Sequence, residues 1–333
     1  MNTVQMGSLA GAVQSGDRSA LARAITLVES SLDRDRHDAE LLLEQLLPAA
    51  GHSIRIGITG IPGAGKSTLI ERLGIQALDS GYKVAVLTVD PSSEKSGGSI
   101  LGDKTRMTLL AARPQAFVRP SPAGITRGGV AARTRECVYL CEAAGFDLVI
   151  VETIGVGQVE LTVSGITDIL VLLLLPGTGD ELQGMKRGAM ELADLVLVNK
   201  ADGPMRNVAL ATVADYRQAI RLTQQSLLGE EVEVIGVSAL EDQGIAEVFQ
   251  KILKLHKKRR DSGVLTARRA EQCRDWLWQA IREAFLESMV GKISPQDGMT
   301  ELEREVVAGR LTASSAARQI VNEYTGRHSG GVT

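Results

Sequence analysis

The sequence predicts an α/β protein in which a mostly parallel central sheet is flanked by helices, with further helical segments at both ends. Three observations predict this fold. Apolar runs alternate with helical stretches through the middle of the 333-residue chain. A glycine-rich segment, Gly60–Ser67, lies between one such run and a helix. Aromatic residues make up only 3% of the chain, so aliphatic side chains must build the core, as in a parallel sheet covered by helices.

Seven apolar runs are expected to be strands. Most of them are continuous rather than alternating, which is typical of strands buried on both faces. They are Ile54–Thr59, Val84–Val89, Ala116–Val118, Leu148–Val151, Ile169–Leu175, Leu195–Val198 and Val232–Val237. The helices expected between them are Leu69–Asp79, Gly128–Ala144, Glu181–Leu192, Asn207–Gln224 and Ile245–Lys257. This alternation predicts right-handed connections within a mostly parallel sheet.

Both ends of the chain show helical periodicity without strand signals. We therefore expect an N-terminal helical extension over residues 1–50, a central domain over 51–262 and a C-terminal helical arm over 263–333. The arm is expected either to cap the central domain or to bury an apolar stripe against a second copy of the chain. The stripe consists of Trp276, Leu277, Ile281, Phe285 and Met289.

The segment Gly60–Ser67 reads Gly-Ile-Pro-Gly-Ala-Gly-Lys-Ser and fits the phosphate-binding pattern GxxxxGK(S/T). Its glycines let backbone N–H groups turn around a phosphate, and the helix that follows adds unpaired donors. Lys66 would reach the β- and γ-phosphates, and the Ser67 hydroxyl would ligate Mg²⁺. The pattern therefore predicts a P-loop NTPase. The residues expected to bind the phosphates are Gly60, Ile61, Pro62, Gly63, Ala64, Gly65, Lys66, Ser67 and Thr68.

A second motif, Asn199-Lys200-Ala201-Asp202, directly follows a predicted strand and so lies at the edge where such sheets bind ligands. The Asp202 carboxylate can accept from both N1–H and the 2-amino group of guanine, whereas adenine offers no such pair of donors. Lys200 would lie along the purine face, and Asn199 would brace the loop. The motif therefore predicts that the nucleotide is GTP or GDP.

Ser238-Ala239-Leu240 follows the last predicted strand and is expected to complete the base site. Its backbone N–H at Ala239 would donate to the guanine O6 atom. Taken with the phosphate loop, this element strengthens the prediction of a guanine nucleotide, because each motif alone fits an ordinary turn.

Three acids are candidates to join Ser67 in holding Mg²⁺, which favours carboxylates beside substrate phosphates. Asp90 and Glu152 each come at the end of a predicted strand, and Asp103 follows a glycine-rich stretch. Gly155 can offer its N–H to the γ-phosphate, so the loop after it is expected to tighten with GTP and relax with GDP.

Catalysis is expected to rest on positioning and on charge stabilisation by Lys66, by a metal held at Glu152 and by backbone amides. Gln158 lies near the place where a residue would orient the attacking water, and a structural role fits it equally well. The sequence therefore assigns no general base.

Composition and the spacing of charged, cysteine and apolar residues argue against several kinds of partner and site. The formal charge is −3, without a strongly basic region, so nucleic acid is not expected as a partner. The basic run Lys257–Arg260 is interpreted as a solvated helix end. Cys137 and Cys141 are interpreted as packed helical thiols rather than metal ligands. The longest apolar run, Ile169–Leu175, is too short to span a bilayer, so we expect a cytoplasmic protein without a membrane partner.

Six segments of the chain resemble the MeaB/ArgK group of metallochaperone-type GTPases, the methylmalonyl-CoA mutase-associated proteins that include the mitochondrial cobalamin A protein. The most specific of these features are the acid-first Glu152-x-x-Gly155 and the loop at 176–183. The segments are Gly60–Thr68, Val89–Ser93, Gly102–Met107, Glu152–Gln158, Pro176–Gln183 and Asn199–Asp202.

The resemblance implies a homodimer that hydrolyses GTP to GDP and phosphate. It implies that this cycle gates delivery of adenosylcobalamin to a cobalamin-dependent methylmalonyl-CoA mutase or related acyl-CoA mutase, and protects that enzyme. It also implies that the loop Gly177–Lys186 is a switch that answers to the partner. Asp180, Glu181 and Lys186 are the charged residues available there.

Two other classes of function fit parts of the sequence. One is an ATP-dependent kinase linked to arginine or ornithine transport, against which the guanine-selective Asp202 argues. The other is a protein-targeting GTPase, which would be expected to carry a methionine-rich or basic appendage that the arm does not resemble.

Overall fold

The computed structural model describes residues 3–30, 32–90, 107–122, 129–153, 163–177, 187–223, 231–293 and 301–326. The chain falls into two compact units, Met1–Cys273 and Arg274–Thr333. Within the described ranges, no helix combines the length and the apolar character needed to cross a bilayer.

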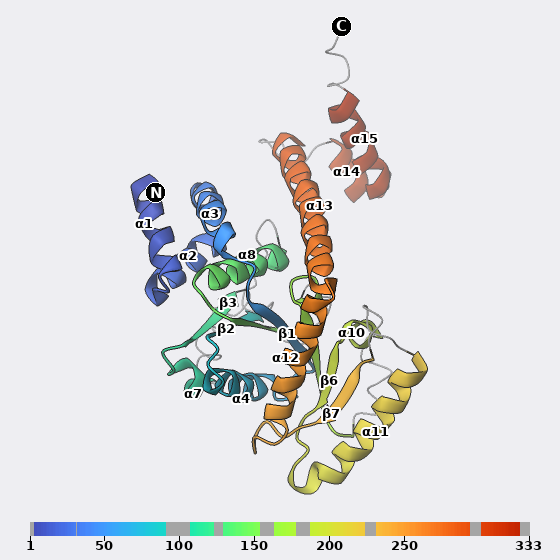
Figure 1. Ribbon diagram of the computed structural model, residues 1–333. Helices are drawn as coiled ribbons and strands as arrows, with labels where there is room; N and C mark the ends of the chain where they lie inside the picture. Colours follow the sequence, from blue (N-terminus) through green and yellow to red (C-terminus); the bar gives the residue numbers. More distant parts are fainter. Residues whose placement is uncertain are drawn as a thin grey trace. The chain divides into compact units, whose positions relative to one another are not determined.

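A seven-stranded sheet forms the centre of the first unit, with strand order β3-β2-β4-β1-β5-β6-β7 (Figure 1). Neighbouring strands pair in parallel throughout. The predicted α/β class with a parallel sheet is therefore confirmed. The bounds are β1 Ile54–Gly60, β2 Val84–Asp90, β3 Ala116–Pro122, β4 Leu148–Thr153, β5 Ile169–Leu174, β6 Leu195–Val198 and β7 Glu233–Gly236.

Burial explains why the strand sequences are continuous apolar runs. Every residue of β1, β4, β5 and β6 is buried, because helices cover both faces of the sheet. Since all the strands are parallel, their carboxyl ends meet at one edge, and the loops that follow β1, β4, β6 and β7 are brought together there.

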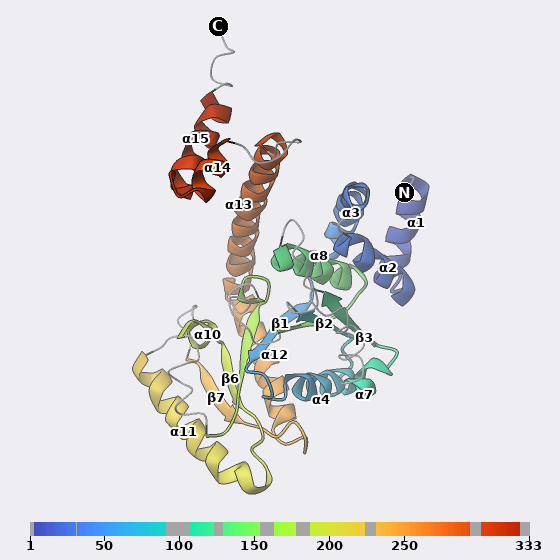
Figure 2. The same cartoon turned by 180° about the vertical axis from the view of Figure 1, so that it is seen from behind.

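Helices α4, α7 and α12 pack on one face, against a core that includes Ile56 and Ile58 of β1. On the other face α8 lies over β2 and β4, and α11 lies over β6 and β7. Figures 1 and 2 show α4 and α8 on opposite sides of the sheet. The bounds are α4 Lys66–Asp79, α7 Thr108–Ala111, α8 Gly129–Ala143, α10 Arg187–Leu192, α11 Arg206–Thr223 and α12 Ile245–Asp261.

The predicted helices agree with these bounds where the structure describes them. Gly128, Gln224 and residues 181–186, which belong to predicted helices, lie outside the described residues. The four-residue α7 was not expected, because a single helical turn is too short to show a periodic pattern.

Three helices, α1 Thr3–Gln14, α2 Arg18–Glu29 and α3 Asp33–Leu46, form the N-terminal part of the first unit. Asp17 caps α2 by accepting a hydrogen bond of 2.8 Å from the Ala20 N–H. The apolar face of α2 includes Leu21 and Ile25, both fully buried, and α2 and α3 pack against α8. The helical expectation for this part of the chain is confirmed.

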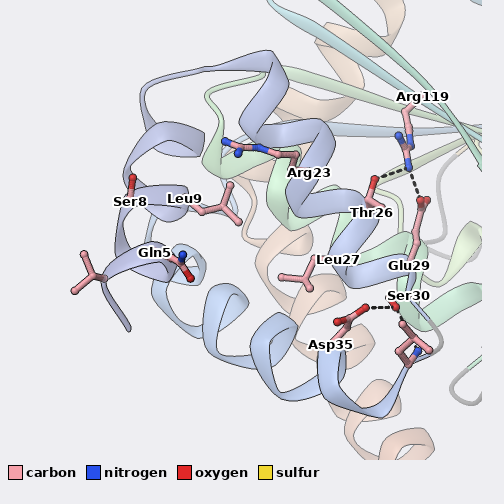
Figure 3. Close-up of a pocket in the computed structure, with 12 residues that line it drawn as sticks. Gln5, Ser8, Leu9, Arg23, Thr26, Leu27, Glu29, Ser30, Asp35 and Arg119 are labelled. Carbon is pink, nitrogen blue, oxygen red and sulfur yellow. Dashed lines mark hydrogen bonds and ion pairs between the residues drawn. The ribbon is translucent and has the colours of Figure 1, made fainter. Parts of the chain in front are cut away.

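A cavity of about 1090 Å³ lies beside these helices, at their junction with the edge strand β3. Figure 3 shows the Arg119 side chain of β3 reaching Thr26 and Glu29 of α2. Arg119 Nη2 lies 2.7 Å from Glu29 Oε2, in a half-buried ion pair. The N-terminal helices are thus bonded to the edge of the sheet as well as packed on α8.

The two cysteines of α8, Cys137 and Cys141, are both buried and form no disulfide. Burial raises the pKa of each thiol well above its usual range, so both remain protonated. This confirms their interpretation as packed helical thiols.

The division between the compact units falls within α13 (Val264–Ile293), after Cys273. The predicted arm begins earlier, at residue 263. In the second unit, five apolar side chains of α13 are exposed: Leu277, Trp278, Ile281, Phe285 and Leu286. Helices α14 Glu301–Val307 and α15 Ala313–Gly326 pack against each other there.

The interpretation of Lys257–Arg260 as a solvated helix end is wrong for Arg259, which is only 1% exposed. Its guanidinium donates to Asp194 Oδ1 at 2.5 Å and to the Asp168 carbonyl at 2.7 Å. Both aspartates directly precede strands, so Arg259 fastens α12 to the amino-terminal edge of the sheet. The buried Asp194 carboxylate stabilises the Arg259 charge in place of the water that would otherwise solvate it.

Replacing Arg259 with Met is expected to destabilise the protein by about 3–5 kcal/mol, because Asp194 would retain a buried charge without its partner. Arg260→Met is the matched control, since the Arg260 side chain is 61% exposed. It is expected to change stability by no more than about 0.5 kcal/mol. Urea unfolding followed by circular dichroism measures both variants, and equal destabilisation would contradict the role of the buried pair.

Candidate nucleotide-binding site

The phosphate loop lies at the carboxyl edge of the sheet, between the end of β1 and the start of α4. Two glycines are required by close contacts. A Cβ on Gly60 would lie 2.3 Å from the Leu173 carbonyl oxygen, and a Cβ on Gly65 would lie 2.5 Å from Asn199 Nδ2. Gly65 also has φ +90°, a conformation that favours glycine. At these two positions the loop packs too closely against β5 and Asn199 to admit a side chain.

Lys66 is the first residue of α4 and is only 8% exposed. Its ammonium donates to the Gly60 carbonyl at 2.8 Å and to the Ile61 carbonyl at 3.1 Å. The side chain therefore folds back over the loop that would hold the phosphates. A cation held in this position can meet the charge of a bound polyanion without a large movement.

Two of the predicted metal ligands lie together. The Ser67 hydroxyl, at the start of α4, donates to Glu152 Oε1 on β4 at 3.1 Å. Glu152 is 4% exposed. Next to it, the buried Thr153 hydroxyl donates to the Thr59 hydroxyl of β1 at 3.0 Å. This second bond, which the sequence did not indicate, ties the strand that carries the acid to the strand that carries the phosphate loop.

Of the other residues predicted around the γ-phosphate, the structure describes only the backbone of Asp90. Asp90 ends β2, whose Val89 lies opposite Thr153 of β4, so its backbone lies at the same edge. Asp103, Gly155 and Gln158 lie outside the described residues.

Asn199 joins the two halves of the site. Its side chain is 3% exposed and donates from Nδ2 to the Ala64 carbonyl at 2.7 Å. Its Oδ1 accepts from the Ala239 N–H at 3.0 Å. Asn199 therefore braces the phosphate loop and the turn after β7 by one hydrogen bond to each. This arrangement differs from the sequence-based assignment in one respect, because the Ala239 N–H predicted for guanine O6 is donated here to Asn199.

Asp202 is oriented by a neighbour whose role the sequence did not identify. The Ser238 hydroxyl, fully buried, donates to Asp202 Oδ2, and Ser238 Oγ accepts from the Glu241 N–H at 3.1 Å. Ser238 was expected to contact the nucleotide directly. Its position fixes the carboxylate that would read the guanine base. Lys200 is exposed, with φ +59°, and Leu240 is 73% exposed.

The loop predicted to answer to a partner is anchored where it leaves β5. The Gly177 N–H donates to the Thr212 hydroxyl of α11 at 3.0 Å, and Thr212 is buried. No motif pointed to Thr212, because a lone threonine in a helix carries no specific signal. Asp180, Glu181 and Lys186 lie outside the described residues.

A phosphate loop on a parallel sheet, with a guanine-type motif held against it, defines a P-loop GTPase. The family model described as "Methylmalonyl Co-A mutase-associated GTPase MeaB" matches residues 21–294. The chain belongs to this family, and it is a GTPase that binds guanine nucleotides. The resemblance noted from the motifs is thereby confirmed.

Relatives cover almost the whole chain. The probable GTPase Rv1496 of Mycobacterium tuberculosis is 49% identical over 313 residues, which is 94% of this chain and 93% of the relative. The mitochondrial methylmalonic aciduria type A homolog of Mus musculus is 41% identical, covering 94% of this chain and 78% of its own. A crystal structure described as a LAO/AO transport system kinase matches with a TM-score of 0.76 and 32% identity, over 98% of this chain and 99% of the other.

Asp202→Asn is expected to weaken GTP binding by roughly 10²-fold or more. The amide replaces two charged acceptors with one neutral acceptor and a donor, and a hydrogen bond to a charged group contributes about 1.5–3 kcal/mol. Binding of xanthosine triphosphate is expected to improve, because its 2-oxo group suits the amide donor. Titration with both nucleotides measures the change. Asp242→Asn is the control, as Asp242 is exposed in the neighbouring turn. Unchanged selectivity in Asp202→Asn would contradict the base assignment.

Proposed function

We propose that the protein is a chaperone of a cobalamin-dependent acyl-CoA mutase of the methylmalonyl-CoA mutase type. Its GTP cycle would gate the loading of adenosylcobalamin and protect the mutase. The observation that carries this proposal is the family match over residues 21–294, which includes the phosphate loop, the base motif and all of α13. The name of the mouse relative, which refers to methylmalonic aciduria, supports the same kind of client.

The proposed catalytic centre uses Mg²⁺ together with groups of the chain. Ser67 and Glu152 offer two adjacent oxygen ligands of the kind that Mg²⁺ prefers, and this adjacency supports the metal assignment. Asp90 and Asp103 are proposed to complete the site. Bound Mg²⁺ would neutralise charge on the phosphates. Lys66 would stabilise the charge that develops during hydrolysis.

The remaining site residues are proposed in the roles that the sequence suggested. Gly155 would contact the γ-phosphate, and Gln158 would orient the attacking water or support the loop. Asp202 would select guanine with the help of Lys200, Asn199 and the Ser238–Leu240 turn. The loop that carries Asp180, Glu181 and Lys186 would respond to the client. Its anchor at Thr212 supports this role, because Thr212 lies on α11, the α-helix that follows the base motif after the short turn Gly203–Met205.

The C-terminal arm is proposed to form a homodimer. Five exposed apolar side chains along α13 support this, since a patch of this kind on a soluble chain marks an interaction site. Residues 1–50, 51–262 and 263–333 are proposed as extension, GTPase domain and arm.

Leu277→Glu is expected to weaken the dimer at least tenfold, because burying an unpaired carboxylate in an apolar interface costs more than about 2 kcal/mol. Leu210→Glu is the matched control. Leu210 lies on α11 and is 57% exposed, compared with 59% for Leu277. Light scattering over a concentration series measures the dissociation constant. A monomeric wild-type protein, or equal dimerisation of the two variants, would contradict the proposal.

GTP turnover is expected to rise severalfold when a purified methylmalonyl-CoA mutase is added, because the loop that carries Asp180, Glu181 and Lys186 would respond to the client. Phosphate release is measured with and without the mutase, and Lys66→Ala serves as the control for contaminating hydrolases. Transfer of adenosylcobalamin into the apo-mutase is followed by absorbance in the same mixtures. Unchanged turnover together with unchanged transfer would contradict the chaperone role while leaving the GTPase assignment intact.

The second candidate is an ATP-dependent kinase linked to arginine or ornithine transport. The description of the matching crystal structure as a LAO/AO transport system kinase favours this candidate. The geometry of Asp202 and Ser238 supports guanine over adenine. Substituting ATP in the turnover assay separates the two functions, since ATP turnover faster than GTP turnover would favour the kinase.

A further inference from the structure

The first turns of α13 are bonded to the segment Val163–Asp168, which leads into β5. Arg269 donates from Nε and Nη2 to the two Asp168 carboxylate oxygens at 2.8 and 2.7 Å. The same guanidinium donates to the Gly51 and Ser53 carbonyls at 2.6 and 2.7 Å. This part of α13 therefore belongs to the same compact unit as the phosphate loop, which extends from Met1 to Cys273.

Gln272 makes the contact that bears most directly on this segment. It is 7% exposed, and its Nε2 donates to the Ser164 carbonyl at 3.2 Å and the Thr167 carbonyl at 3.0 Å. Arg268 adds a bond of 3.3 Å to the same Ser164 carbonyl. Thr167 is fully buried, so its carbonyl has no solvent to replace this donor. Two main-chain carbonyls of one turn are thus held by one amide group.

The held segment rests on β1, the strand that carries the phosphate loop. A Cβ on Gly57 would lie 2.6 Å from Val163 Cγ1 and 3.0 Å from Thr167 Oγ1. The backbone is joined as well, since the Arg55 N–H donates to Asp168 Oδ2 and the Asp168 N–H donates to the Arg55 carbonyl, each at 2.9 Å. Interiors packed this closely transmit displacement rather than absorb it. A shift of Val163–Asp168 must therefore move β1.

We propose that Gln272 is a positioning residue for GTP hydrolysis. It holds Val163–Asp168 against β1 and so fixes the strand on which the phosphate loop is built. Through the same contact, a displacement of the first turns of α13 would reach the nucleotide site. Anything that binds the arm and shifts the first turns of α13 changes turnover. A partner that binds the GTP and GDP states with different affinities also changes the relative affinity of the protein for the two nucleotides by the same factor. This inference rests on the GTPase activity alone and holds whichever protein is the client.

Gln272→Glu provides a sharp test, because it keeps the size of the side chain and turns a carboxylate toward two carbonyl oxygens. We expect kcat for GTP to fall roughly tenfold, while KM stays within about twofold, since the contacts to the base and the loop remain. Gln272→Ala is expected to give a smaller fall in kcat. Gln250→Glu is the matched control, with the same chemical change at an exposed position of α12. Rates are normalised to the fraction of molecules that bind GDP.

Hydrogen exchange provides an independent readout. In the wild type, amide exchange in residues 163–168 and 264–273 is expected to differ between the GDP complex and a complex with a non-hydrolysable GTP analogue. In Gln272→Ala the difference at 264–273 is expected to disappear, while the difference at the phosphate loop persists. The proposal is overturned if kcat of correctly folded Gln272→Ala stays within 20% of wild type. It is also overturned if amide exchange at residues 264–273 of the wild type is the same in the GDP complex and the GTP-analogue complex. If Gln272→Glu does not fold, the Gln272→Ala results decide.

Discussion

One buried amide group, that of Asn199, joins the loops that follow β1, β6 and β7 into a single site. It donates to the phosphate loop at Ala64 and accepts from the base-side turn at Ala239. Leaving either buried partner unsatisfied would cost about 1–3 kcal/mol. The contact also explains the glycine at position 65, where a Cβ would collide with the Asn199 amide. The part of the site that grips phosphate and the part that selects the base therefore cannot move independently.

The opposite edge of the sheet is organised by charge. Asp168 and Asp194 precede β5 and β6, and the arginines of α12 and α13 reach them from outside the sheet. Buried pairs of this kind contribute little net stability, because desolvation offsets the attraction. They do specify where each helix must lie. Burial lowers the pKa of His256 on α12, so this histidine is neutral at neutral pH and adds no further cation beside the arginines.

The sequence predicted most of the fold because its strongest signals are local. Seven apolar runs, most of them continuous, and the helices between them can be recognised without knowledge of tertiary contacts. The glycine-rich pattern likewise predicts the conformation of the phosphate loop from its own residues. The features that were missed depend on partners distant in the chain. Arg259 looks like one more solvated base in Lys257–Arg260 until Asp194 is placed beside it. The bond from the Ser238 hydroxyl to Asp202 cannot be predicted until the turn after β7 is placed beside the loop after β6. The bond between Thr153 and Thr59 similarly requires the pairing of β4 with β1.

The polar groups that a nucleotide needs already have protein partners. The Lys66 ammonium donates to two carbonyls of its own loop, the Ser67 hydroxyl donates to Glu152, and the Ala239 N–H donates to Asn199. Binding therefore exchanges hydrogen bonds rather than adding them, and each exchange is worth much less than the bond itself. The affinity for GTP must come mainly from the charge of the polyanion and from the charged acceptor that Asp202 offers to the base. These bonds hold Lys66, Ser67 and Asn199 in place before the ligand arrives, so that little binding energy is consumed in positioning these three groups.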